Sequence, residues 1–151
     1  MENYYCYALS ADRKSSTALE FLKQFIPGTE LSWDQEDLEF TIGLPKIELF
    51  EQLTEFLELN VATDISLYFS NALESVPYCA ILDYCSDGSL IFGLAADDNN
   101  DSAQALLVSL ESFVKDTGYW GGDNEAPPTS KEEFTERRAF GREPRVEPVN
   151  A

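Results

Sequence analysis

The sequence predicts an α+β fold, in which a mostly antiparallel sheet of about six strands packs against three main helices. Three observations point to this fold. The chain has 151 residues, which is the size of one domain, and 44% of them are hydrophobic. Several short segments alternate apolar and polar residues, as half-buried strands do, and three longer segments repeat apolar residues at helical spacing. We expect one domain over residues 1–140 and a flexible C-terminal tail over 141–151.

The first six predicted elements follow the order β-α-β-β-α-β. They are a strand at 4–9, a helix at 17–26, a hairpin of strands at 30–33 and 38–42, a helix at 45–59 and a strand at 65–69. A capping box at Thr17–Glu20 opens the first helix, and Pro27 ends it. Apolar and polar residues alternate from Leu38 to Ile42, which favours a strand after an acidic turn at 34–37. This order matches the ferredoxin-like arrangement of elements.

The second half of the chain is predicted to add a hairpin and two helices. They are strands at 78–84 and 89–94, a long helix at 102–115, a loop at 119–123 and a short helix at 130–140. Ser86–Gly88 is a typical turn sequence between the two strands. Gly118 ends the long helix, and a capping box at Ser130–Glu133 opens the short one.

The charge of the chain is strongly negative. Ten Lys and Arg stand against 28 Asp and Glu, which gives a formal net charge of −18. Residues 1–130 alone hold 5 basic and 23 acidic residues, and no basic residue lies between Lys46 and Lys115. The negative charge therefore belongs to the folded body. Such a surface repels phosphate, so we expect no direct binding of nucleic acid or of an anionic membrane.

The residue types argue against most catalytic chemistry. The chain has no histidine, which excludes a histidine general base, a Ser-His or Cys-His dyad and a His-ligated metal. It has no glycine-rich phosphate loop, nucleophile elbow or paired CxxC motif. Asp97–Asp101 resembles the start of a calcium loop, but Ser102 and Val108 occupy the positions that need Gly and Glu. We expect no enzyme activity, metal or cofactor. A small enzyme that uses carboxylates alone is an alternative.

The chain is expected to be cytoplasmic. Its N-terminus lacks the basic and apolar regions of a secretory signal, and its apolar stretches are short. The three cysteines, at positions 6, 79 and 85, are an odd number, which fits a reducing compartment. Cys79 and Cys85 would lie roughly 20 Å apart along one strand, too far for a disulfide. We expect all three to act as small buried hydrophobic residues.

Acidic and aromatic residues form the candidate partner-binding set. One face of the helix at 45–59 carries a stripe of like charges. Such a stripe is compatible with a face that only contacts water, and it would also attract a basic partner. An acidic cluster precedes the helix at 102–115, and large aromatic residues stand beside acids in turn-rich segments, as interface anchors often do. The set is Glu48, Glu51, Glu55 and Glu58; Asp97, Asp98 and Asp101; Trp33 and Asp34; and Tyr119, Trp120 and Asp123.

This profile resembles the immunity proteins of bacterial polymorphic, contact-dependent and type VI toxin systems. The residues that prompt the comparison are the stripe at 48–58, the cluster at 97–101 and the loop at 119–123. The resemblance implies a non-enzymatic protein that binds and inhibits one basic toxin domain, in some cases a nuclease. A DNA mimic of the anti-restriction type is the alternative, and long parallel rows of carboxylates would favour it. An adaptor domain whose acidity serves solubility alone is a further alternative. The sequence leaves the oligomeric state open.

Overall fold

The computed structural model describes all residues except 1–3, 45, 74–75, 97–99, 122–125 and 142–151. In chain order, the elements are β1 (Tyr4–Leu9), α1 (Ser15–Phe25), α2 (Gln35–Ile42), α3 (Phe50–Leu59), β2 (Ile65–Ser70), β3 (Cys79–Tyr84), β4 (Leu90–Ala96), α4 (Asn100–Val114), β5 (Tyr119–Gly121) and α5 (Lys131–Gly141). The fold is α+β, as the sequence predicts. None of the described helices is long and apolar enough to cross a membrane.

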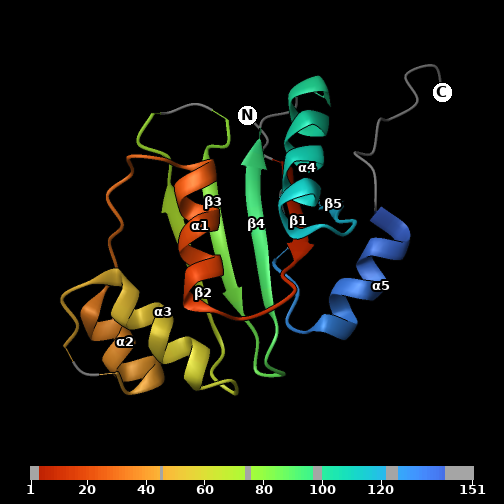
Figure 1. Ribbon diagram of the computed structural model, residues 1–151. Helices are drawn as coiled ribbons and strands as arrows, with labels where there is room; N and C mark the ends of the chain where they lie inside the picture. Colours follow the sequence, from red (N-terminus) through yellow and green to blue (C-terminus); the bar gives the residue numbers. More distant parts are fainter. Residues whose placement is uncertain (1–3, 45, 74–75, 97–99, 122–125, 142–151) are drawn as a thin grey trace.

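All five strands form one sheet in the order β2-β3-β4-β1-β5, and every neighbouring pair is antiparallel. The predicted hairpin of β3 and β4 is present, and Tyr84 pairs with Leu90 beside its turn. β2 lies at one edge of the sheet and β5 at the other (Figure 1). The edge strand β2 has six residues, whereas β5 has three.

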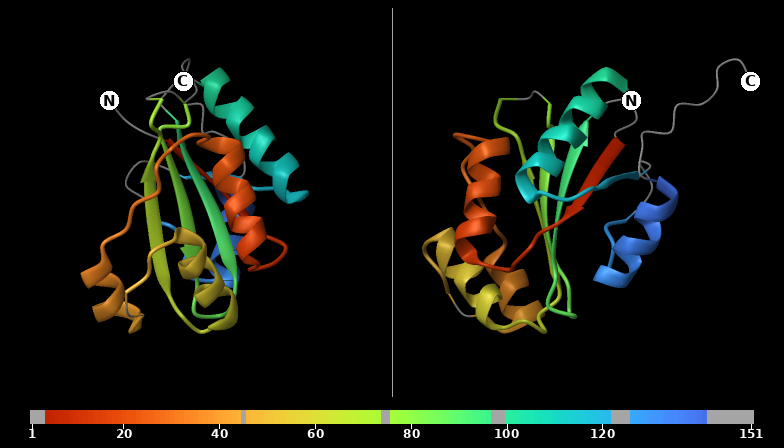
Figure 2. Two further views of the ribbon diagram at one scale, coloured as in Figure 1. Left: turned by 60° about the vertical axis from the view of Figure 1, so that its left-hand side comes forward. Right: turned by 45° about the vertical axis from the view of Figure 1, so that its right-hand side comes forward.

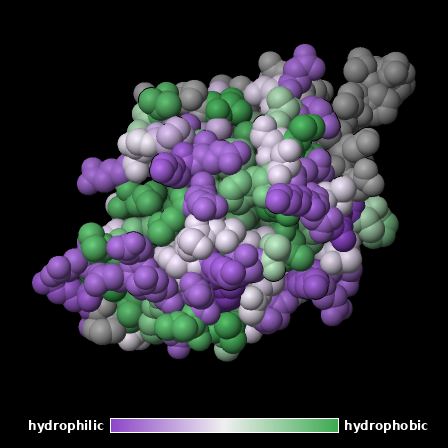
Figure 3. All heavy atoms as spheres, in the orientation of Figure 1, coloured by the Kyte–Doolittle hydropathy of each residue, from purple (hydrophilic) through white to green (hydrophobic). Residues whose placement is uncertain are grey.

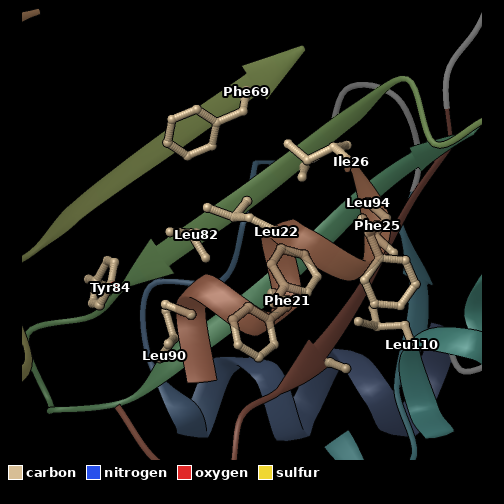
Figure 4. Close-up of a cluster of buried hydrophobic side chains, with 14 of the residues drawn as sticks. Phe21, Leu22, Phe25, Ile26, Phe69, Leu82, Tyr84, Leu90, Leu94 and Leu110 are labelled. Carbon is tan, nitrogen blue, oxygen red and sulfur yellow. The ribbon is translucent and has the colours of Figure 1, made fainter. Parts of the chain in front are cut away.

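The main core lies between one face of the sheet and the helices α1, α3 and α4. Successive strand residues alternate between the two faces, so Leu82 and Phe92 point into this core. Phe21 of α1 is fully buried and stacks on Phe92, with 4.2 Å between ring centroids. Figure 4 shows side chains from α1 gathered over β3 and β4. Burial of a side chain such as Phe21 contributes about 2–3 kcal/mol to stability.

The opposite face of the sheet is partly covered by α5, which Figure 2 shows on the other side from α1 and α4. Phe134 of α5 is fully buried and packs on Tyr119, with ring centroids 5.4 Å apart. The first turn of α5 is tied to the β3–β4 turn, because the Lys131 N–H donates to an Asp87 carboxylate oxygen at 2.8 Å. The chain thus folds around two hydrophobic clusters, one on each face.

A buried arginine joins three parts of the fold. Arg13 lies between β1 and α1. Its guanidinium donates to backbone carbonyls in the last turn of α3, in the segment that follows α3 and in the β3–β4 turn. The acceptors are Leu57, Asn60, Thr63, Cys85 and Ser89, at 2.6–3.2 Å. The guanidinium also lies 5.0 Å from the centre of the Tyr84 ring. Arg13 therefore holds the end of α3 and the β3–β4 turn together.

The predicted hairpin at 30–42 is wrong, because residues 35–42 form the helix α2. Asp34 is the N-cap, and its side chain accepts a hydrogen bond from the Asp37 N–H. Gly43 ends the helix in the left-handed conformation, with φ of 69°. Leu38 and Ile42 are one helical turn apart and both pack on the core. The alternation that suggested a strand therefore arises from a short helix.

Three further details of the sequence prediction are corrected. Over the described residues, the sheet has five strands instead of six and five helices accompany it, so the ferredoxin-like order does not hold. Residues 119–121 form β5 instead of a loop, because Trp120 pairs with Cys6 of β1. α3 begins at Phe50, after Pro45, and α1 begins at Ser15, before Thr17. The predicted helices at 102–115 and 130–140 correspond to α4 and α5.

Candidate functional site

One end of the molecule carries a dense group of exposed carboxylates. α2, α3 and their flanking loops lie together at this end, and hydrophilic side chains cover much of it (Figures 1 and 3). The exposed carboxylates of α2, α3 and the segments that precede these helices are Glu30, Asp34, Glu36, Asp37, Glu39, Glu48, Glu51 and Glu55. We call this set the acidic end. Lys46 is the one lysine or arginine between Lys23 and Lys115.

A large aromatic side chain is exposed near the C-terminus of α2, within the acidic end. Phe40 is 92% exposed. The helix turns Leu38 and Ile42 toward the core, which leaves Phe40 on the outer face. Glu36 and Asp37 lie four and three residues before Phe40, so they are its neighbours on the helix surface. An exposed phenylalanine flanked by carboxylates is the composition of an interface anchor with a charged rim.

Three of the four glutamates in the predicted stripe are exposed, and the fourth is not. Glu51 and Glu55 are exposed one helical turn apart, and Glu48 is exposed just before the helix begins. Glu58 is half-buried, and its carboxylate accepts a hydrogen bond from the Ser15 N–H at 2.7 Å. Glu58 therefore stabilises the N-terminus of α1 against α3, and Glu48, Glu51 and Glu55 are left for solvent or a partner.

The carboxylates of the acidic end have no cationic partner within the described residues. The ion pairs between described residues lie elsewhere and involve arginines of α5. Arg137 pairs with Glu133 at 3.4 Å, and Arg138 pairs with Asp116 at 3.6 Å. Asp34 and Asp37 accept hydrogen bonds from neighbours on α2. The acidic end therefore keeps a net negative field that can attract a positively charged molecule.

A groove runs along the free edge of β2. It has a volume of about 470 Å³ and lies between β2 and the segment that leads into α2. Ser32, Trp33, Asp34, Asp37 and Leu38 line one side of the groove, and Ser66, Leu67, Tyr68 and Phe69 line the other. Trp33 is half-buried and packs on Phe50, which in turn packs on Phe69. Aromatic packing thus supports the groove from beneath, and carboxylates stand at its rim.

Other residues of the predicted partner-binding set lie elsewhere. Tyr119 and Trp120 are only 1% and 6% exposed, so they belong to the core and do not form an exposed surface. Their burial follows from the pairing of β5 with β1, which turns the two side chains to opposite faces of the sheet. Asp101 is exposed in the first turn of α4, and Figure 1 shows α4 well away from α2. Asp97, Asp98 and Asp123 lie outside the described residues.

The cysteine thiols are held in their neutral form. Burial raises the pKa of Cys85 to about 12, and the nearby charge of Asp83 adds to the shift. Burial also raises the pKa of Cys6 and of the half-buried Cys79. A protonated thiol is a poor nucleophile and a poor metal ligand at neutral pH. Within the described residues, no three His, Cys, Asp or Glu side chains gather in a way that would hold a metal ion.

One buried carboxylate was not singled out from the sequence. Asp83 on β3 is 3% exposed and accepts a hydrogen bond from the Ser66 hydroxyl at 2.8 Å. Burial raises its pKa to about 6, although the Ser66 bond opposes the shift. The Cys85 sulfur lies 3.7 Å from the other carboxylate oxygen. Asp83 therefore changes charge in mildly acidic solution, within the fold and away from the acidic end.

Sequence reasoning also missed Phe40 and its acidic neighbours, although a signal was present. Asp34 followed by Gly43 nine residues later frames a short helix with an N-cap and a left-handed C-terminal glycine. The pair Leu38 and Ile42 fits one helical turn as well as it fits a strand. With the helix recognised, Phe40 falls on the outer face, beside Asp37.

Comparisons of the chain with protein families, with characterised proteins and with solved structures found no match. The function is therefore argued from the geometry and charge of the acidic end.

Proposed function

We propose that this protein is a non-enzymatic acidic binding protein that neutralises a basic partner protein through its acidic end. The observation that carries the proposal is the exposed Phe40, which lies one helical turn from Glu36 and Asp37, two carboxylates with no cationic partner among the described residues. Exposing an aromatic ring and collecting like charges both cost free energy in the isolated protein. Both costs fall when a basic surface covers this end.

The physical roles of the two residue classes differ. Exposed carboxylates such as Glu51 and Glu55 attract the partner at long range and raise the association rate. Phe40 supplies apolar area that loses water in the complex, so it slows dissociation. The shape of the acidic end favours the class of toxin immunity proteins, which the sequence resembles, over a DNA mimic. Its two helices have eight and ten residues, which is too short for long parallel rows of carboxylates, and Phe40 is exposed beside two of the acids.

The test begins with affinity capture of the partner from a lysate of the source organism. The bait is the full chain, and a variant with Phe40→Ala, Glu51→Gln and Glu55→Gln is used in parallel. We expect a protein with a basic domain to be captured by the wild type and lost by the variant. The purified partner should bind at one-to-one stoichiometry. Its association rate constant should fall at least tenfold between about 50 mM and 500 mM salt.

A matched control separates local charge from total charge. Glu132 and Glu136 are exposed on α5, on the other face of the sheet from α3. The double variant Glu132→Gln and Glu136→Gln removes as many charges as Glu51→Gln and Glu55→Gln, and it should leave binding unchanged. Equal losses from both double variants, or an association rate that does not depend on salt, would contradict the proposal.

Inhibition is tested on the partner itself. If the partner is a toxin, its expression should stop growth of a host cell, and co-expression of this chain should restore growth, whereas the Phe40 and glutamate variant should not. A DNA mimic gives a different result. Its partner would bind duplex DNA, and DNA would compete with this chain in proportion to concentration.

A further inference from the structure

The free edge of β2 presents a row of backbone hydrogen-bonding groups toward the groove. The Asn71 N–H donates to the Tyr78 carbonyl at 3.0 Å, and antiparallel pairing alternates from there along the strand. Residues 65, 67 and 69 therefore bond to β3, and the backbone N–H and C=O of Ser66, Tyr68 and Ser70 point outward. Among the described residues, no second strand pairs with this edge.

This edge lacks the features by which proteins usually protect an exposed strand. β2 contains no proline and no charged residue, and its register with β3 is unbroken from Ile65 to Ser70. Natural edge strands are commonly protected by lysine, proline or bulges, because an open edge attracts other strands. The segment that leads into α2 runs beside β2, but the groove separates the two. Tyr68, in the middle of β2, is 54% exposed. The edge is thus long, regular and open.

The charge at the groove selects the kind of strand that it would accept. Asp34 and Asp37 line the side opposite β2, and both carboxylates are exposed. Among the described residues that line the groove there is no lysine or arginine. An extended segment that pairs with β2 would bring alternate side chains past these carboxylates, because side chains alternate along a strand. Lysine or arginine at those positions would be attracted, and aspartate or glutamate would be repelled.

From this geometry we propose that an extended basic segment of the partner adds a strand to the sheet at the β2 edge and places its cationic side chains beside Asp34 and Asp37. The inference rests on the proposed function, because it names the segment by which the basic partner is held. Asp37 and Phe40 are three residues apart on α2, so the groove adjoins the aromatic part of the acidic end. Backbone pairing supplies affinity, and the carboxylates select the charge of the bound strand.

A second copy of this chain is the competing occupant, and charge argues against it. Each copy would bring a formal charge of −18, and the two β2 edges would bring their Asp34 and Asp37 rims together. Like charges opposed across an interface are unfavourable. A basic segment would instead be attracted to the carboxylates beside the same edge.

The first test uses a synthetic peptide in place of the unidentified partner segment. The probe is an end-blocked six-residue peptide of alternating lysine and valine, and the control replaces each lysine with glutamate. Backbone amide exchange is followed by NMR in the full chain. We expect the lysine peptide to protect the outward amides of Ser66, Tyr68 and Ser70 from exchange. The amides of Leu67 and Phe69, which already bond to β3, should not change, and the glutamate peptide should have no effect.

Two variants of this chain make the test specific. Tyr68→Pro removes one outward N–H at an edge position, where proline is tolerated, and should abolish protection of Ser66 and Ser70. Asp34→Asn with Asp37→Asn keeps the side-chain oxygens but removes both charges, and should weaken peptide binding about fivefold. If Tyr68→Pro does not fold, as judged by circular dichroism, two other measurements replace it. The asparagine variant should bind the lysine peptide more weakly, and a lysine peptide with alternate residues N-methylated, which lacks the backbone donors for pairing, should not protect the outward amides.

Three results of these experiments would contradict the inference. Absence of peptide binding, binding that leaves the three outward amides unprotected, or protection that appears with a dimer mass and no peptide would each overturn the inference. The captured partner separates this inference from the proposed function. If Phe40→Ala and the Glu51 and Glu55 changes abolish partner binding while Tyr68→Pro has no effect, the acidic end stands and the edge inference fails. The reverse pattern would retain the edge with Asp34 and Asp37 and overturn the role proposed for Phe40, Glu51 and Glu55.

Discussion

Replacement of Asp83 by asparagine should stabilise the protein at neutral pH. The Asp83 carboxyl is buried on β3, and its pKa rises from the ordinary value of 3.8 to about 6. Above pH 6 the native state must hold a buried negative charge, and the Ser66 hydroxyl is its hydrogen-bond donor from β2. Asparagine keeps an oxygen that can accept the Ser66 bond, and it carries no charge. The variant thus mimics the protonated form at every pH.

The magnitude follows from the change in pKa. Between about pH 4 and about pH 6, the native state binds more protons at this site than the unfolded state does, so stability falls as pH rises. A shift of this size corresponds to about 3 kcal/mol at pH 7. We therefore expect Asp83→Asn to be more stable than the wild type by up to about 3 kcal/mol at pH 7, and equally stable near pH 4. In a chain of this length the gain equals about 6–12 °C in melting temperature.

Urea denaturation of both proteins from pH 4 to pH 8 measures this difference directly. The difference in unfolding free energy should grow between pH 4 and pH 6 and stay constant above. Glu39→Gln removes an exposed carboxylate on α2 and serves as the matched control, with a change below about 0.5 kcal/mol at every pH. A variant difference that does not depend on pH would refute the reasoning, and so would a loss of stability at pH 7.

Further predictions concern the packing. Arg13→Met should destabilise the protein by about 3–5 kcal/mol, because five buried or partly buried carbonyls lose their hydrogen-bond donor. Urea denaturation measures this loss, and a much smaller loss would show that water takes the place of the guanidinium. Gly118→Ala should cost about 2 kcal/mol or more, because a methyl group there would lie 2.3 Å from the Tyr7 carbonyl oxygen; an unchanged melting temperature would contradict that geometry. Phe40→Ala should leave stability within about 0.5 kcal/mol, whereas Phe21→Ala should cost about 3–5 kcal/mol, and similar losses for both would show that Phe40 is not exposed.

The elements that the sequence predicted well are those whose pattern is local and long. The apolar positions of α3 and α4 repeat over several turns, and the β3–β4 hairpin has a strong turn signal at Asp87-Gly88. α2 was predicted as strands because eight residues hold too few turns to separate the two periods. β5 was missed because three residues carry almost no pattern, and only the edge of β1 makes them a strand.

The candidate site divides in the same way. Asp34, Glu48, Glu51 and Glu55 could be predicted as exposed because burial of a charged side chain is unfavourable unless a partner compensates it. Glu58 follows the exception, since it is half-buried and accepts the Ser15 N–H. Aromatic residues have no such constraint. The sequence favoured Tyr119 and Trp120 as surface anchors and overlooked Phe40, and the structure reverses these positions.

The residue composition determined the sign of the net charge and the absence of histidine, and the order of the apolar residues determined the helical character of the longest periodic segments. The tertiary structure decided where that charge is concentrated, which aromatic side chain lies beside it and which strand edge remains open. The physical reason is that charge and long periodicity are properties of consecutive residues. Burial depends instead on contacts between distant ones, such as β1 with β5 and α2 with the core.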